Sequence, residues 1–199
     1  MGAQLYQGGS LFVPSGSRKY LNAAERRRFI ESAQQLPPRA GLFCLTLAWS
    51  GARISEVLAL TPAAFDLDMG VACIETLKRR KRGVVRQVPL PDELLGALNR
   101  VFQLRRRQAD AELAVTRLWS WSRATAWRRV KQTMTAAGIS GAPAMPKGLR
   151  HAFGVRAFQA NVPPHLVQKW LGHASLRTTA IYGDVMGADE RAIAARMWR

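Results

Sequence analysis

The segment at 40–49 constrains the fold most. It is long enough to form a helix, and that helix would be apolar on nearly every side. A helix with this pattern lies inside a protein rather than on its surface. Pro37-Pro38 ends the helix before it, and Ser50-Gly51 breaks the buried helix itself. The preceding helix begins at Asn22, where Glu25 three residues later completes a capping box. The sequence therefore predicts a helical domain with one interior helix.

One hairpin interrupts this helical pattern. The runs at 71–77 and 84–90 are rich in β-forming residues and flank a strongly basic tip, which predicts two antiparallel strands. Apolar periodicity and end signals predict further helices at 53–58, 92–106, 123–137, 147–160, 164–172, 175–183 and 188–198. The expected fold class is mainly α with a small antiparallel β-sheet (α+β). We expect one compact domain at 21–199, after a basic, flexible arm at 1–20.

The charge balance points to a polyanionic partner. The chain carries 30 Lys and Arg against 13 Asp and Glu, a formal net charge of +17, and nucleic acid is the usual partner of such a surface. No apolar run approaches the roughly 18 residues of a spanning helix, and residues 1–17 lack the apolar core of a signal peptide. We expect Cys44 and Cys73 to be buried, reduced thiols of a cytoplasmic, nucleoid-associated protein. No cluster of Cys and His has the spacing of a zinc site.

Cations and an imidazole gather near the C-terminus. Lys147 and Arg150 are three residues apart on an expected helix, so they share a face and can converge on one anion. His151 lies about 100° further round and is expected to point toward the interior. Leu171-Gly172 ends the next helix, which leaves His173 where it can donate to a phosphate oxygen or relay a proton. Alternatively, Lys147 and Arg150 are solvated surface cations and His173 is a structural helix-end residue.

Tyr182 follows as the candidate nucleophile. A phenol with a pKa of about 10 reacts poorly unless cations lower that pKa or a base removes the proton. Arg150, His173 and Arg53 could supply that setting, and Glu56 could brace the guanidinium of Arg53. Alternatively, Tyr182 is a core residue and Arg53 forms an ordinary helical ion pair with Glu56. A phenol beside phosphate-binding cations suggests attack on a DNA phosphodiester rather than DNA binding alone.

Two further groups of cations are expected to hold DNA. Six lie between Lys78 and Arg86, and they would most simply grip the DNA backbone. Those of the hairpin tip are Lys78, Arg79, Arg80, Lys81 and Arg82. On the expected helix after Ser122, a basic stripe with one aromatic ring would consist of Arg123, Trp127, Arg128 and Lys131. Neither group predicts which bases are read.

Taken together, these elements resemble the tyrosine recombinases, also called the phage-integrase family, over about residues 20–199. The strongest segment has Gly148-Leu149-Arg150-His151, then Leu171-Gly172-His173, then Tyr182. The histidine of the second motif follows the arginine by 23 residues and the tyrosine follows nine later, as in the family. Gly51-Ala52-Arg53-Ile54-Ser55-Glu56 looks like the family's first-arginine segment. The resemblance implies the catalytic domain of a site-specific DNA recombinase or integrase.

The resemblance also implies roles for individual residues. Tyr182 would attack the scissile phosphate and form a covalent 3′-phosphotyrosine. Arg53 and Arg150 would clamp the non-bridging oxygens, while His173 would hydrogen-bond to the phosphate and assist proton transfer. A hairpin lysine acts in the family as general acid toward the leaving 5′ oxygen, and Lys78 and Lys81 are both candidates here. No metal or nucleotide cofactor is implied, because fixed cations can stabilise the transferred phosphoryl group.

The sequence departs from the family in two places. The family has a histidine three positions before its second arginine, where this chain has Lys147, which donates hydrogen bonds but cannot relay protons at neutral pH. We expect activity to survive with a shifted pH profile. The family's N-terminal core-binding domain has no counterpart in residues 1–20, so we expect an accessory DNA-binding protein to support high affinity for a site.

The family acts on double-stranded DNA as homo-tetramers that exchange C-terminal segments. The helix expected at 188–198 is a candidate for that exchange, or it folds back on its own core. Two other functions compete with recombination: a catalytically silent DNA-binding accessory protein of the same fold, and a type IB topoisomerase-like enzyme that relaxes DNA. No motif identifies the target site or distinguishes integration from excision or resolution.

Overall fold

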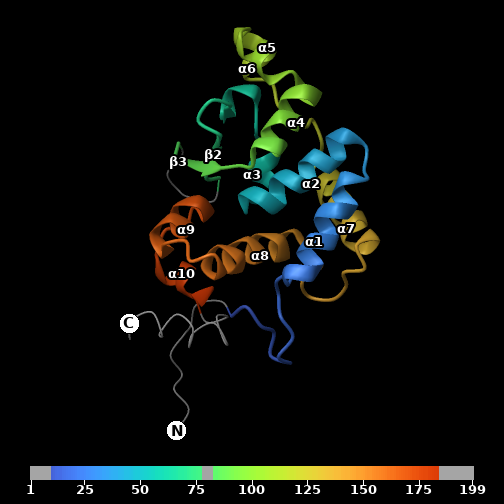
Figure 1. The fold of residues 1–199 in the computed structure, drawn as a ribbon, viewed down its shortest axis with the longest axis vertical. Coiled ribbons are helices and arrows are strands. Elements are labelled where there is room, and N and C mark those ends of the chain that lie inside the picture. Colours follow the sequence, from blue (N-terminus) through green and yellow to red (C-terminus); the bar gives the residue numbers. More distant parts are fainter. Residues whose placement is uncertain (1–9, 78–82, 184–199) are drawn as a thin grey trace.

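The computed structural model of the chain describes residues 10–77 and 83–183 (Figure 1). Its helices are α1 (Ala23–Gln34), α2 (Pro38–Ser50), α3 (Ile54–Leu58), α4 (Asp92–Phe102), α5 (Leu104–Gln108), α6 (Ala111–Ala114), α7 (Arg123–Ala136), α8 (Pro146–Gln159), α9 (Pro164–Leu171) and α10 (Arg177–Ala180), with a 3-10 turn at Pro62–Ala64. Its strands are β1 (Phe65–Asp66), β2 (Val71–Glu75) and β3 (Val85–Pro89). The predicted fold class, mainly α with a small antiparallel sheet, is confirmed.

Helix α2 lies in the interior, as its apolar pattern predicts. Helices α1, α4, α7 and α8 all contact it, and Figure 1 shows it between them. Phe43 and Cys44 have no exposed surface, because their neighbours on every side are other elements of the domain. The helix ends at Gly51, whose φ of +61° places it in the left-handed region that favours glycine.

The predicted capping box opens α1. The side chain of Asn22 accepts from the backbone N–H of Glu25 at 2.8 Å, and the carboxylate of Glu25 accepts from the backbone N–H of Asn22 at 3.0 Å. Two donors that a helix start leaves unpaired are thereby satisfied. Ser122 caps α7 with its side chain alone, which accepts from the N–H of Thr125 at 3.1 Å.

The sheet contains the predicted hairpin and one short strand that the sequence did not reveal. Strand β2 pairs antiparallel with β3, with Ile74 opposite Arg86, and β1 pairs antiparallel with the other edge of β2. Two residues are too few for an alternating pattern, which is why β1 escaped prediction. The hairpin tip at 78–82 lies outside the described residues.

The single helix expected at 92–106 is wrong, because it is broken at Gln103. This residue has a φ of +53°, so α4 ends at Phe102 and α5 begins at Leu104. In one continuous helix these two side chains would point about 200° apart. The break allows both to reach the core, where Phe102 is 3% exposed and Leu104 is fully buried.

A second, smaller core lies beside α8, α9 and α10. It contains Val155 of α8, Val167 of α9, Tyr182 after α10, and Leu11 from the segment that precedes α1. Residues 10–20 are thus partly packed: the N–H of Lys19 donates to the carbonyl of Leu11 at 2.7 Å. The second core therefore contains Tyr182, the candidate nucleophile.

The cysteines and the membrane-span expectation can be compared with the structure directly. Cys44 and Cys73 are both free thiols, as predicted, but Cys73 is half-buried rather than buried. Within residues 10–77 and 83–183, no helix is long and apolar enough to cross a membrane. The helix expected at 188–198 lies outside the part of the chain that the structure describes.

Candidate active site

The structure brings the separate sequence motifs to one hollow of about 680 Å³. Arg53 reaches it from the residue before α3, Lys147 and Arg150 from the first turns of α8, His173 from the turn after α9, and Tyr182 from the turn after α10. Arg53 lies far before the other four residues in the chain, whereas α8, α9 and α10 follow one another, and α9 packs against both α8 and α10 (Figure 1). The convergence of five candidate residues is what makes this hollow the candidate active site.

Arg150 is held by the backbone on both sides. Its Nη1 donates to the carbonyl of Gly51 at 2.8 Å and its Nη2 to the carbonyl of Leu171 at 2.5 Å. Only 7% of the residue is exposed. Burial, and after it the charge of Arg53, lowers the pKa of Arg150 to about 10, so the group is still a cation at neutral pH. The structure therefore presents a fixed, poorly solvated positive charge.

Arg53 is braced by Glu56, as the sequence predicts. Its Nη1 donates to the Glu56 carboxylate at 2.7 Å, and its backbone N–H donates to the same carboxylate at 2.9 Å. Glu56 is fully buried within this pair. Burial raises the pKa of the carboxyl, but the charge of Arg86 and the hydrogen bonds from both arginines outweigh burial, and the net pKa of Glu56 is lowered. An ionised Glu56 therefore holds the first arginine in place.

The expectation that Arg86 grips the DNA backbone is wrong, because this cation is buried within the domain. It is 5% exposed and donates to Glu56 at 2.6 Å, to the Thr76 hydroxyl at 2.9 Å and to the carbonyl of Trp170 at 2.7 Å. The sequence carried a signal for this: Arg86 and the buried Val88 are two residues apart and face the same side of a strand. Arg86 joins the hairpin to the braced arginine and to the end of α9.

His173 is oriented by the short helix that follows it. Its Nδ1 lies 2.8 Å from the hydroxyl of Thr179, which is fully buried. Burial, and then the charges of Arg150 and Arg53, lower the pKa of His173 to about 3, so the imidazole is neutral at neutral pH. The turn before it requires Gly172, whose φ is +63° and whose position leaves only 3.0 Å between an added Cβ and Thr76 Oγ1. The structure thus agrees with the predicted helix end at Leu171-Gly172.

Tyr182 packs its ring against α8. A Cβ added at Gly154 would lie 2.6 Å from the tyrosine ring, so this helix face must be bare. Burial raises the pKa of the Tyr182 phenol, although the charges of Arg150 and Arg53 act in the opposite direction. The expected cations are present, but they do not outweigh burial. The phenol is therefore protonated in this structure and requires a proton acceptor before it can attack.

His151 is the site residue that sequence reasoning missed. The prediction that it points inward agrees with its 9% exposure, but its Nδ1 also lies 3.1 Å from the Tyr182 hydroxyl. It lines the same hollow as Lys147 and Arg150. A signal existed in the sequence, because His151 is four residues from Lys147 and so lies on the same side of α8.

The expected DNA-binding residues fall into two groups. The tip cations Lys78, Arg79, Arg80, Lys81 and Arg82 lie outside the described residues. Arg123 is exposed on α7 and lines the candidate active site, while Arg128 is exposed on the same helix. Lys131 donates to the carbonyl of Ala144 at 2.8 Å, so its charge is tied to the loop before α8.

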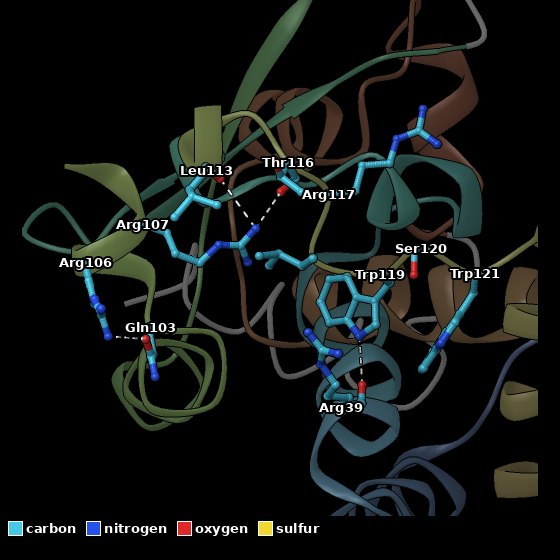
Figure 2. A pocket seen from close by; sticks show the side chains of 11 residues that line it. Arg39, Gln103, Arg106, Arg107, Leu113, Thr116, Arg117, Trp119, Ser120 and Trp121 are labelled. Atoms are coloured by element: carbon cyan, nitrogen blue, oxygen red, sulfur yellow. Dashed lines mark hydrogen bonds between the residues drawn. The ribbon is translucent and has the colours of Figure 1, made fainter. Parts of the chain in front are cut away.

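Beyond Arg123, the surface continues as a row of hollows. A second hollow shares Ser55, Leu77 and Arg123 with the candidate active site. It shares Arg117 and Trp121 with a third, of about 520 Å³, which Figure 2 shows. Each hollow therefore shares lining side chains with the next, and the row extends from Tyr182 to the segment after α6.

The third hollow, which we call the arginine–tryptophan hollow, is lined by Arg39, Arg106, Arg107, Arg117, Trp119 and Trp121 among others. Arg107 spans it to the carbonyls of Leu113 and Thr116, at 3.4 and 3.2 Å, and Trp119 donates to the carbonyl of Arg39 at 2.8 Å (Figure 2). The other three arginines are exposed. Within the residues described, no group of three or more His, Cys, Asp or Glu side chains is placed to hold a metal ion.

Known proteins are similar to this chain in sequence. The sequence model of the Phage integrase family matches residues 19–188. The tyrosine recombinase XerA of Pyrococcus furiosus is 31% identical over 175 residues, which cover 85% of this chain and 58% of that protein. The tyrosine recombinase XerD of Neisseria meningitidis serogroup A is 34% identical over 142 residues, which cover 68% and 47%. The chain thus spans about half the length of these curated relatives.

Solved structures share the fold. A crystal structure of XerA recombinase aligns with a TM-score of 0.71 at 26% identity, over 89% of this chain and 64% of the other. The site-specific recombinase XerH, bound to a palindromic difH substrate in a post-cleavage complex, aligns with a TM-score of 0.72 at 25% identity, over 90% and 53%. The described part of the chain therefore has the fold of these recombinases.

Proposed function

The chain belongs to the phage integrase family, and from that premise we propose that it is a site-specific tyrosine recombinase that cuts and rejoins DNA strands through Tyr182. The observation that carries the proposal is the meeting of Arg53, Arg150, His173 and Tyr182 around one hollow. Arg53 and Tyr182 are 129 positions apart in the sequence, yet both line this hollow. A phosphodiester fits, because the hollow offers fixed cations to an anion and a hydroxyl to its phosphorus.

In the proposed reaction, Tyr182 Oη forms a bond to the scissile phosphorus while the bond from phosphorus to the 5′ oxygen breaks. Arg53 and Arg150 hold the non-bridging oxygens, and their bracing by Glu56 and by backbone carbonyls means that no reorganisation is needed during the step. His173 donates to the same phosphate. A hairpin lysine, Lys78 or Lys81, protonates the leaving oxygen.

Lys147 stands on the open side of the hollow, exposed on the first turn of α8. Its ammonium is a third cation for the phosphate rather than a proton relay. The phosphotyrosine conserves the energy of the phosphodiester, so a 5′ hydroxyl of another strand can reseal it. The cycle is therefore a transesterification that needs no nucleotide.

We propose that duplex DNA follows the row of hollows away from Tyr182, past Arg123 and Arg117. This path is supported by exposed cations at each hollow and by the net charge of +17. Arg128 and the tip cations would meet the backbone beside it. Contacts of this kind position the duplex and carry no base preference by themselves.

The domain and assembly are proposed on the same basis. Residues 21–199 would form the catalytic domain, with 1–20 as a basic arm. Rejoining strands from two sites requires more than one copy on double-stranded DNA, so we propose a homo-tetramer, with an accessory DNA-binding protein as a further partner. The place of action would be the nucleoid of the cytoplasm.

A covalent-trapping experiment tests the function. Duplexes of randomised sequence that carry one 5′-bridging phosphorothiolate are incubated with the protein in EDTA and run on a denaturing gel. Wild type and the matched control Tyr20→Phe are expected to give a protein–DNA band, whose DNA is then sequenced. Tyr182→Phe is expected to give none while binding DNA within about twofold of wild type, since only a hydroxyl is removed.

Two results would contradict the proposal. A covalent band that persists in Tyr182→Phe would place the nucleophile elsewhere. DNA binding without any band in wild type would favour the accessory protein of the same fold.

A further inference from the structure

The fate of the Tyr182 proton is the open chemical question at this site. Burial keeps the phenol protonated, and the proton must leave as Oη bonds to phosphorus. Arg53, Arg150 and Lys147 are cations without a free lone pair and cannot accept it. His173 has its Nδ1 engaged by Thr179 at 2.8 Å, and its ring is nearly parallel to the tyrosine ring, at 12° with centroids 6.2 Å apart. A stacked ring does not direct a nitrogen at the phenolic oxygen.

His151 is the group that reaches the phenol. Its Nδ1 lies 3.1 Å from Tyr182 Oη, within the range for a catalytic proton transfer. The two rings are tilted by 55° with centroids 5.9 Å apart, an arrangement that allows the hydrogen bond between ring nitrogen and hydroxyl. His151 belongs to α8, so its place is set by the same helix that carries Arg150.

We propose that His151 is the general base of the reaction, accepting the proton of Tyr182 at Nδ1 as the phenolic oxygen attacks phosphorus. The inference rests on the proposed function and names a catalytic residue for it. In the step, the O–H bond of the phenol breaks, an N–H bond forms at Nδ1, Oη bonds to phosphorus, and the 5′ oxygen leaves with a proton from the general acid. In resealing, the imidazolium returns its proton to Oη as the 5′ hydroxyl displaces the tyrosine.

The surroundings keep His151 ready to accept. Burial, and then the charges of Lys147, Arg150 and Lys19, lower the pKa of His151 to about 4, so the imidazole is neutral at neutral pH. These cations come from α8 and from the segment before α1, and His173 and Tyr182 complete the charged or titratable surroundings. A bound phosphodiester brings negative charge to the same cations. It therefore makes the imidazolium easier to form when DNA is present than when it is absent.

This assignment also explains how a lysine at position 147 is compatible with catalysis. An ammonium there cannot remove a proton, so a lysine is compatible with catalysis if the base stands elsewhere on the same side of α8. His151, one helical turn further along, occupies such a place.

The first test reads the tautomer and needs no DNA. Nitrogen-15 NMR of imidazole-labelled protein at neutral pH is expected to show His151 with an unprotonated Nδ1 and a proton on Nε2. The three histidines are assigned with His151→Gln, His173→Gln and His165→Gln. A proton on Nδ1 would mean that His151 donates to Tyr182 and would overturn the proposal, whatever the trapping experiment shows.

The second test uses the duplex captured in the trapping experiment. His151→Phe and His151→Gln are expected to slow covalent linkage about 10²–10⁴-fold, the usual contribution of a general base. His165→Phe, exposed on α9, is expected to match wild type. Thermal melting identifies any variant that fails to fold. Rates of both variants within about threefold of wild type would overturn the assignment.

A third test distinguishes a His151 that removes the Tyr182 proton from one that only positions the tyrosine ring. Replacing Tyr182 by a fluorinated tyrosine, whose phenol ionises at lower pH, is expected to restore most of the rate lost in His151→Gln and to change the rate of the parent protein little. An equal effect in both backgrounds would show that His151 only positions the ring. A parent protein that forms no covalent product would instead contradict the proposed function, and the assignment of His151 with it.

Discussion

The candidate active site and the arginine–tryptophan hollow are both rich in arginine, but they hold it differently. In the active site, Arg150 and the neighbouring Arg86 are nearly buried and their donors are matched to carbonyls and to one carboxylate. In the other hollow, Arg106 and Arg117 stand in solvent. The same residue type therefore acts as a fixed charge in one place and as a screened, movable charge in the other.

The difference shows how one basic chain can separate chemistry from affinity. A desolvated cation stabilises a transition state strongly because no water competes and no reorganisation is needed. A solvated cation attracts DNA phosphates through counterion release, which weakens with salt. Net charge alone describes only the second kind, whereas the burial and the hydrogen bonds of each arginine distinguish the two.

Replacing the positioned guanidinium of Arg150 is expected to have the largest effect on the rate of covalent linkage. In Arg150→Lys the flexible ammonium lacks the rigid fork that donates from two nitrogens to Gly51 and Leu171, so the cation loses its position. We expect covalent linkage to DNA to slow by about 10³-fold, with DNA binding reduced much less. Single-turnover trapping measures the rate. Arg156→Lys, exposed on the same helix, is the control, and equal rates for the two variants would contradict the comparison.

Removing the shared carboxylate is expected to cost stability. Glu56→Gln leaves Arg53 and the buried Arg86 without a counter-charge, and breaking a buried pair from one side destabilises by about 3 kcal/mol. Urea unfolding measures the change. The exposed Glu93→Gln on α4 should stay within about 0.5 kcal/mol of wild type. A similar small change in Glu56→Gln would mean that the buried network contributes little.

Acidification is expected to act through the two site histidines. The folded-state pKa values of His151 and His173 are lowered to about 4 and about 3, so between these values and the usual 6.5 the unfolded chain binds more protons. Stability is therefore full above pH 6.5 and is lost as pH falls, by up to about 1.4 kcal/mol per pH unit for each histidine. Urea titrations from pH 7 to pH 5 check the slope. His151→Phe should have a shallower slope, and His165→Phe should keep that of wild type.

The smallest effect is expected in the arginine–tryptophan hollow. Arg117→Gln removes one solvated cation from the proposed DNA path, so binding should weaken by a few fold and the slope of log affinity against log salt should fall by about one. Covalent linkage at saturating DNA should not change. Fluorescence anisotropy at several salt concentrations measures the slope, with Arg27→Gln on α1 as control. An unchanged slope in Arg117→Gln would remove this hollow from the path.

Much of the fold could be predicted because its signals are local. The interior helix, the capping box of α1 and the two long strands each depend on patterns within a few residues of one another. The break at Gln103 could not be predicted, since it is decided by two core positions that only the assembled domain defines. Strand β1 is too short to carry a pattern at all.

The site was predictable where spacing alone was informative. Arg150, His173 and Tyr182 stand at the intervals of a known family, and the bracing of Arg53 by Glu56 follows from a separation of three residues. The roles of His151 and Arg86 depend on partners 31 and 30 positions away, and pairings at that distance leave no periodic trace. The protonated state of Tyr182 likewise follows from burial, which the sequence does not report.

The contact between Arg86 and Glu56 also sets limits for protein engineering. A chimera that borrows a hairpin from a relative would be divided safely between Thr76 and Val84, whose backbone hydrogen bond of 2.9 Å closes the strand pair. A graft that extends through residue 86 would replace Arg86 and so remove the ion pair that it forms with Glu56. Because the proposed general acid is Lys78 or Lys81, a borrowed tip would have to supply a lysine of its own, while the strand that carries Arg86 stays with Glu56.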